Sequence, residues 1–149
     1  MSRLAIAVLV VAACSRTDSA PKPAPEPMHV EKAPAGFSIE ARIDGAPTTW
    51  AEDVFDRVEH HAVANNRGQP RDTWSLRDLV HAMVGANARV VAVVGATKQA
   101  ITPEAWADAS RTPVVHRTGR GGLKFRWADA SGKWDEESVN DVVALEIVR

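Results

Sequence analysis

The chain has 149 residues, 45% hydrophobic and 25% charged, and its 18 basic and 19 acidic side chains leave a net charge of −1. So balanced a charge argues against a general nucleic-acid binder, because such proteins carry a clear excess of basic residues. A chain of this length accommodates one domain with one core. Its unusual features are a single cysteine and five tryptophans in the absence of tyrosine.

The chain begins with a short apolar segment that ends at its only cysteine, Cys14. Arg3 supplies a positive charge, residues 4–13 supply the apolar run, and small residues precede the cysteine. This order of parts is typical of a targeting segment that is removed from the mature protein. Ten residues reach roughly 15 Å as a helix, about half of the hydrocarbon core of a bilayer, so length argues against a transmembrane helix.

The residues Val11-Ala12-Ala13-Cys14 resemble the lipobox of bacterial lipoproteins, in which the cysteine is acylated and becomes the new N-terminus. The resemblance implies that residues 1–13 are a signal peptide and that Cys14 carries lipid such as palmitate. Several acyl chains hold a protein firmly on a membrane. We therefore expect a periplasm-facing protein of the cell envelope, whose partners are the membrane and an envelope protein or glycan. Ser15 is not the aspartate that resembles an inner-membrane retention signal, which favours the outer membrane.

Residues 14–36 are predicted to form a disordered linker behind the lipid anchor. The prolines of this stretch are Pro21, Pro23, Pro25, Pro27 and Pro34. Alternating prolines favour the polyproline II conformation, in which about 22 residues extend up to about 70 Å. The remaining residues, 37–149, are predicted to form a single globular domain.

The first half of this domain shows alternating strand and helix signals. Apolar and polar residues alternate over residues 37–43 before Asp44-Gly45, which predicts a half-buried strand and a tight turn. Thr49 and Glu52 have capping-box spacing, which predicts a short helix. Residues 75–85 combine a serine N-cap, an apolar stripe and a terminal glycine, and predict a second helix.

The second half continues in the same way. The β-branched run at residues 90–94 predicts a strand buried on both faces. Thr102 and Pro103 predict an N-cap and a proline at the first helical position, opening a helix through about Ala109. Further strands are predicted over residues 114–116, 123–127 and 142–148. The sum is a single mixed α+β domain, rich in strand, with two or three short helices.

A basic, glycine-rich stretch is the leading candidate for a binding site. Its candidate residues are Arg117, Arg120, Gly121, Gly122 and Lys124. Glycines let backbone N–H groups approach an anion, and arginine holds phosphate or carboxylate bidentately, so the stretch is a candidate anion- or ligand-binding loop. The alternative is a plain turn between two antiparallel strands, with glycines for positive φ and arginines for solubility. The spacing fits neither a Walker loop nor a dinucleotide fingerprint.

The remaining chemistry-bearing residues form no catalytic pattern. His60 and His61 are adjacent, so they point apart on a helix or a strand, and there is no HExxH, GxSxG or triad-like order. No catalytic residue and no metal ligand is therefore predicted. Tryptophans of a small domain are more often buried than exposed, and Trp134, beside a turn-like stretch, is the one expected to be exposed, where it could stack on sugar rings.

Four segments, in this order, resemble the sulfite-oxidase-type molybdopterin-binding domain family, specifically its small, reduced members. They are Ile43-Asp44-Gly45, residues 74–80, Gly121-Gly122-Leu123-Lys124-Phe125 and residues 138–148. The resemblance implies the fold of that family. Active members bind molybdenum through a cysteine thiolate, whereas residues 37–149 contain no cysteine, and Leu123 stands where the family has a proline.

Two functional classes follow. The favoured one is a non-catalytic envelope lipoprotein whose domain binds a partner or small ligand and needs no cofactor. The alternative is a molybdopterin-dependent, oxidoreductase-like redox protein acting on a small substrate. The missing cysteine weighs against an enzyme and against a bound molybdopterin, because it removes the ligand that the family uses for the metal.

Overall fold

The architecture is given by a computed structural model that describes residues 36–65 and 67–149. The predicted signal peptide, Cys14 and the linker up to residue 35 lie outside the described residues. In the described part of the chain, no helix is both long enough and apolar enough to cross a membrane.

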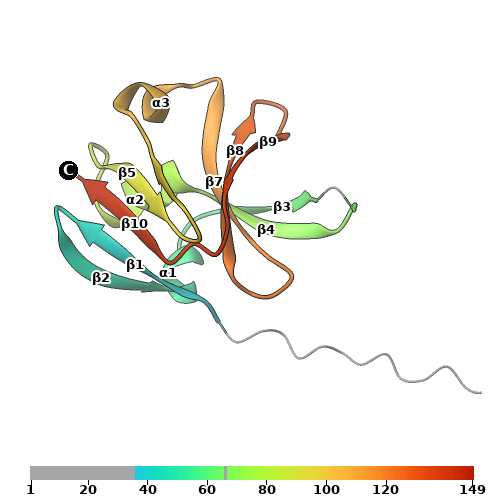
Figure 1. The fold of residues 1–149 in the computed structure, drawn as a ribbon, viewed down its shortest axis with the longest axis horizontal. Coiled ribbons are helices and arrows are strands. Elements are labelled where there is room, and N and C mark those ends of the chain that lie inside the picture. The colour runs from blue at the N-terminus through green and yellow to red at the C-terminus, as the bar shows by residue number, and fades with distance from the viewer. Residues whose placement is uncertain (1–35, 66) are drawn as a thin grey trace, which may run out of the picture. The chain divides into compact units, whose positions relative to one another are not determined.

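The first sheet is built around the first and last strands of the domain (Figure 1). Its order is β2-β1-β10-β5-β6. The strands are β1 (Ser38–Ile43), β2 (Ala46–Ala51), β5 (Arg89–Val94), β6 (Lys98–Ala100) and β10 (Ala144–Val148). β1 and β10 run parallel, with Ala41 opposite Leu145, and the other pairs are antiparallel. The predicted turn after β1 is confirmed, since Asp44 and Gly45 have φ of 50° and 86°.

The second sheet is antiparallel throughout, in the order β3-β4-β7-β8-β9. Its strands are β3 (His60–Ala64), β4 (Pro70–Ser75), β7 (Arg111–Arg117), β8 (Leu123–Asp129) and β9 (Trp134–Val139). Residues 118–122 join β7 to β8, and the Thr118 N–H donates to the Gly122 carbonyl at 2.8 Å. Gly121 has φ of 86°. The glycine-rich stretch is thus a hairpin turn in which a glycine adopts positive φ.

The three helices in the described residues are α1 (Glu52–Phe55), α2 (Leu76–Met83) and α3 (Pro103–Ala107). Two predicted N-caps are confirmed: Ser75 Oγ accepts from the Asp78 N–H at 3.3 Å, and Thr102 Oγ1 accepts from the Ala105 N–H at 3.2 Å. Such caps satisfy backbone donors in the first turn of a helix. The short helix predicted after Thr49 is present as α1, but its predicted start is wrong. Thr49 lies in β2 opposite Glu40, and the ladder with β1 outweighs the local capping signal.

One cluster of buried side chains draws on both sheets and all three helices. Helix α2 packs on β5 of the first sheet and on β4 and β7 of the second, with Leu76, Leu79 and Val80 fully buried. Four tryptophans, Trp50, Trp74, Trp106 and Trp127, are only 2–8% exposed, as predicted for core residues. The molecule is therefore a strand-rich α+β domain, with two five-stranded sheets and three short helices in its described part.

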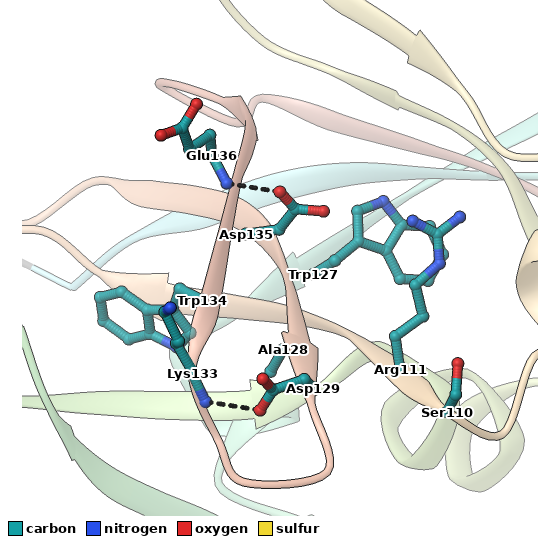
Figure 2. A pocket seen from close by; sticks show the side chains of 9 residues that line it. All are labelled: Ser110, Arg111, Trp127, Ala128, Asp129, Lys133, Trp134, Asp135 and Glu136. Carbon is teal, nitrogen blue, oxygen red and sulfur yellow. Dashed lines mark hydrogen bonds between the residues drawn. The ribbon is translucent and has the colours of Figure 1, made fainter.

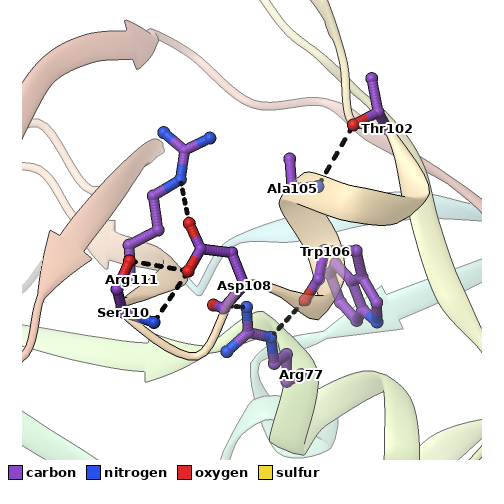
Figure 3. Close-up of polar contacts among 7 residues, drawn as sticks. All are labelled: Arg77, Thr102, Ala105, Trp106, Asp108, Ser110 and Arg111. Carbon is purple, nitrogen blue, oxygen red and sulfur yellow. Dashed lines mark hydrogen bonds and ion pairs between the residues drawn. The ribbon is translucent and has the colours of Figure 1, made fainter.

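Helix α3 is held against α2 by one arginine (Figure 3). Arg77 donates from Nε to the Trp106 carbonyl at 2.8 Å and from Nη2 to the Asp108 carbonyl at 2.7 Å. Asp108 then turns the chain into β7, since its Oδ1 accepts from both the N–H and the hydroxyl of Ser110. The helix accordingly ends at Ala107, two residues before the predicted Ala109.

Candidate anion-binding site

The second sheet has one face in the core and one face turned away from it. Along β8, Leu123, Phe125 and Trp127 are buried in the core cluster, so Lys124 and Arg126 point to the opposite face because strand side chains alternate. This outer face carries a cavity of about 270 Å³. Its charged and titratable lining residues are Arg67, Arg71, His116, Lys124 and Arg126. We call it the basic cavity.

No carboxylate among the described residues lines the basic cavity. Within the part of the chain that the structure describes, Arg67, Arg71, Lys124 and Arg126 also form no ion pair within 4 Å. The pKa of Lys124 is lowered, first by burial and then by the positive charge of Arg126, with Asp141 opposing. Like charges held together in a partly buried place repel, so this arrangement costs the free protein stability that an anion would restore.

His116 lies in the wall of the basic cavity with only 6% of its surface exposed. Its pKa is lowered from 6.5 to about 4, mainly by burial, with contributions from Arg126, Lys124 and Arg71, while the bond to the Arg117 carbonyl opposes the shift. The ring is therefore neutral at pH 7. Its Nδ1 lies 3.3 Å from that carbonyl oxygen, which can only accept, so Nδ1 carries the proton. Nε2 is then a buried acceptor, and no partner for it exists among the described residues.

Polar contacts in the β3–β4 hairpin position its two arginines. Asn65 Oδ1 accepts from the backbone N–H groups of Arg67 and Gln69 at 2.9 and 3.0 Å. Gln69 Oε1 in turn accepts from Arg71 Nη2 at 3.0 Å. Across the cavity, a Cβ added to Gly119 would lie 3.3 Å from Arg71 Nη2. The glycine thus lets the β7–β8 turn approach the guanidinium closely.

Trp134 covers part of the outer face of the sheet from the edge strand β9. Its ring stacks on His116, with centroids 4.3 Å apart and planes at 13°, and the Arg126 guanidinium lies 5.6 Å from its centre. Its Nε1 is buried and has no partner among the described residues. Trp134 is half-buried, whereas the other four tryptophans are buried.

The five candidate residues from the sequence are divided between different places. Lys124 lines the basic cavity, and Arg120 lines an adjoining cavity of about 460 Å³ together with Lys124 and Asp141. Gly121 and Gly122 belong to the hairpin turn. Arg117 points elsewhere: its Nη1 donates to Glu52 at 2.7 Å and its guanidinium lies 5.7 Å from the centre of the Phe37 ring.

Four lining residues, Arg67, Arg71, His116 and Arg126, were not among the sequence candidates. For Arg126 a signal was present, because it lies two residues from Lys124 and alternate residues of a strand share a face. His116 adjoins the candidate Arg117 in the sequence and lies directly opposite Lys124 in the β7–β8 ladder. Arg67 and Arg71 come from a hairpin some 50 residues earlier. No local pattern marks them, because they join the site only through the pairing of β4 with β7.

Another cavity of about 460 Å³ lies along β9, and Trp134 is among the residues that line it (Figure 2). There the Arg111 guanidinium lies 4.3 Å from the centre of the Trp127 ring. The lining mixes Arg111 and Lys133 with three carboxylates, Asp129, Asp135 and Glu136. The Asp129 carboxylate is already hydrogen-bonded within the turn before β9, since its Oδ1 accepts from Ser131 and Lys133. Its mixed charge makes this cavity a weaker anion site than the basic cavity.

No protein-family model, no curated protein and no solved structure matches the chain. Among the described residues, no group of three or more histidine, cysteine, aspartate or glutamate side chains is placed to hold a metal ion.

Proposed function

We propose that this protein is a lipid-anchored protein of the bacterial cell envelope whose domain binds a small anionic ligand without transforming it. The observation that carries the binding function is the convergence of Arg67, Arg71, Lys124 and Arg126 on one cavity that no described carboxylate enters. Phosphate and carboxylate groups are the ligands that such clusters favour, because arginine binds them bidentately and lysine as a point charge.

The anchor rests on the sequence alone. Val11-Ala12-Ala13-Cys14 supports lipidation at Cys14, and residues 14–36 support a spacer between membrane and domain. In this arrangement the basic cavity faces the periplasm and samples ligands close to a membrane, with the outer membrane favoured by Ser15.

We further propose that the fold is related to the sulfite-oxidase-type molybdopterin domains. In support, the four resembling segments fall on the turn after β1, the entry to α2, the β7–β8 turn with β8, and the end of the chain from β9 to β10. The chain does not fit the metal centre of that family, because residues 37–149 offer no thiolate to molybdenum. We therefore propose a binding protein and not a molybdenum oxidoreductase.

Calorimetric titration of the full-length protein with inorganic phosphate tests the binding function. Arg71→Ala and Arg126→Ala should each weaken binding at least tenfold, because each removes a charge-assisted contact. Arg42→Ala, on the other sheet, is the matched control and should bind like the wild type. Equal affinity in all three variants, or no phosphate binding by the wild type, would refute the proposal.

Processing at Cys14 tests the anchor separately. Cys14→Ser, or treatment of cells with globomycin, should block maturation and release the protein from the membrane fraction. Unchanged mobility and fractionation would show that Cys14 is not lipidated.

A further inference from the structure

Besides the cavity of Figure 2, Trp134 lines two cavities on the outer face of the second sheet. One is the basic cavity, and the other, of about 470 Å³, lies further along the outer face of the second sheet. Both cavities have Trp134 in their lining. A ligand held at the basic end can therefore extend past one indole ring into the second cavity, which we call the hydroxyl cavity.

The hydroxyl cavity differs in chemistry from its neighbour. Its wall includes Thr73, Ser75 and Thr112, which carry hydroxyls, together with the apolar side chains of Val63 and Val114. Carboxylates also line it, among them Glu59 and Asp78, which are exposed. The charged side chains of the basic cavity are thus all cationic. The hydroxyl cavity offers several hydrogen-bond acceptors around a small apolar floor, and it includes Arg77, whose guanidinium is bound to the Trp106 and Asp108 carbonyls.

The basic cavity itself includes one hydrogen-bond acceptor, in the histidine that stacks on Trp134. His116 Nε2 is a neutral, buried acceptor without a partner among the described residues. A buried acceptor without a partner costs free energy, and a ligand hydroxyl removes that cost. An anionic oxygen cannot do so, because it does not donate. The wall of the basic cavity next to Trp134 therefore favours an O–H group beside the anion.

We infer that the ligand is a sugar phosphate, and this inference rests on the proposed anion-binding function. The phosphate occupies the basic cavity, and the sugar ring lies against Trp134 with its hydroxyls directed at His116 Nε2 and at the acceptors of the hydroxyl cavity. The apolar face of a sugar ring packs on an indole, whose large flat surface favours such contacts. A purely aromatic body would leave the carboxylates and hydroxyls of the wall desolvated and unpaired.

The test compares four probes on the full-length protein by calorimetry: inorganic phosphate, glucose 1-phosphate, N-acetylglucosamine 1-phosphate and phenyl phosphate. At least one sugar phosphate should bind tenfold or more tightly than inorganic phosphate and than phenyl phosphate. Trp134→Ala should abolish this preference, so that the ratio of the sugar-phosphate affinity to the inorganic-phosphate affinity, measured on the same variant, falls from tenfold or more to about one. Glu136→Ala, on the same strand but lining the cavity of Figure 2, should keep the preference.

Fluorescence gives a second readout that does not depend on a large affinity change. The sugar phosphate should alter tryptophan emission in the wild type and not in Trp134→Phe, because the other four tryptophans are buried. Equal binding of all phosphates, a preference for phenyl phosphate, or a preference that survives Trp134→Ala would overturn the sugar-phosphate inference while leaving anion binding intact. Failure of inorganic phosphate to bind would refute the proposed function itself.

Discussion

The two sheets of this domain treat their outward-facing charges in opposite ways. On the first sheet, Arg42 pairs with Glu40 and lies 3.6 Å from Glu146, and Lys98 lies 2.7 Å from the same Glu146. On the second sheet, Lys124 and Arg126 share a cavity with two further arginines and no described carboxylate. The same residue types are thus neutralised on one face and left in mutual repulsion on the other. Charge that a fold does not neutralise internally is available to a ligand.

His116 provides the largest expected effect, because the first sheet holds no comparable buried titratable group among the described residues. The folded protein protonates this ring only near pH 4, whereas the unfolded chain does so near 6.5. Between these values the unfolded state binds more protons, so the free energy of unfolding falls as the pH is lowered from about 6.5 to about 4, by about 3 kcal/mol at most. Urea denaturation across this range should show the loss in the wild type and a smaller loss in His116→Gln. Parallel pH profiles for the two proteins would contradict the assignment.

A pair of charge reversals tests the comparison directly. Lys124→Glu should weaken phosphate binding at least a hundredfold, about 2.7 kcal/mol, because it places a carboxylate inside the basic cavity. The fold itself should be no less stable, since repulsion with Arg126 is relieved. Lys98→Glu should leave binding within twofold but lower the free energy of unfolding by about 0.5–1 kcal/mol, because it faces Glu146. Calorimetry and urea denaturation of both variants separate the two effects, and the reverse pattern would show that the sheets have been assigned the wrong roles.

Substitution of Arg117 tests whether this residue belongs to the basic cavity or contributes only to stability. Its bond to Glu52 is half-buried, with side-chain exposures of 21% and 36%, so Arg117→Ala should cost about 1 kcal/mol of stability. Phosphate affinity should stay within twofold of the wild type, as measured by the same titration. A tenfold loss of affinity would instead show that Arg117 contributes to phosphate binding, as its position in the basic stretch of the sequence suggested.

The smallest effect is expected on the first sheet. Both side chains of the Arg42–Glu40 pair are 44% exposed, so Arg42→Ala should change the free energy of unfolding by at most about 0.5 kcal/mol. Denaturation at low and high salt should show this difference shrinking as the charges are screened. A larger effect that persisted in high salt would mean that the packing of the Arg42 stem, and not its charge, contributes to stability.

The sequence predicted the elements whose signals are local. The turn at Asp44-Gly45, the Ser75 cap of α2 and the Thr102-Pro103 start of α3 all depend on residues within four positions of one another. β3 and β4 were not predicted, because neither shows a sustained apolar alternation: β3 is a mostly exposed edge strand, and in β4 only Thr73 and Trp74 are buried. At Thr49 the local signal was misleading: the capping-box spacing predicted a helix start there, but Thr49 pairs with Glu40 in a strand.

The same limit applies to the candidate site: residues marked by a local pattern could be predicted, and residues placed by strand pairing could not. Lys124 could be identified because it lies in the basic stretch, and Arg117 was grouped with it although the two adjoin the same turn from opposite faces of the sheet. Separating them requires knowing which strand positions face the core, which the buried Phe125 and Val115 decide. Arg67 and Arg71 could not be assigned at all, since only the register between β4 and β7 brings them to β8.

The position of β10 in the middle of the first sheet has a consequence for the order of folding. β1 is hydrogen-bonded to β2 on one side and to β10 on the other, and β10 in turn joins it to β5. The residues that meet there, such as Glu40 and Ala144, are about a hundred positions apart, and contacts of such long range form slowly. The first sheet therefore cannot be completed before β10 is available. In the second sheet, β7, β8 and β9 pair with their neighbours along the chain, and β7 pairs in addition with the earlier strand β4. The outer face of the second sheet can therefore begin to form before the first sheet is complete.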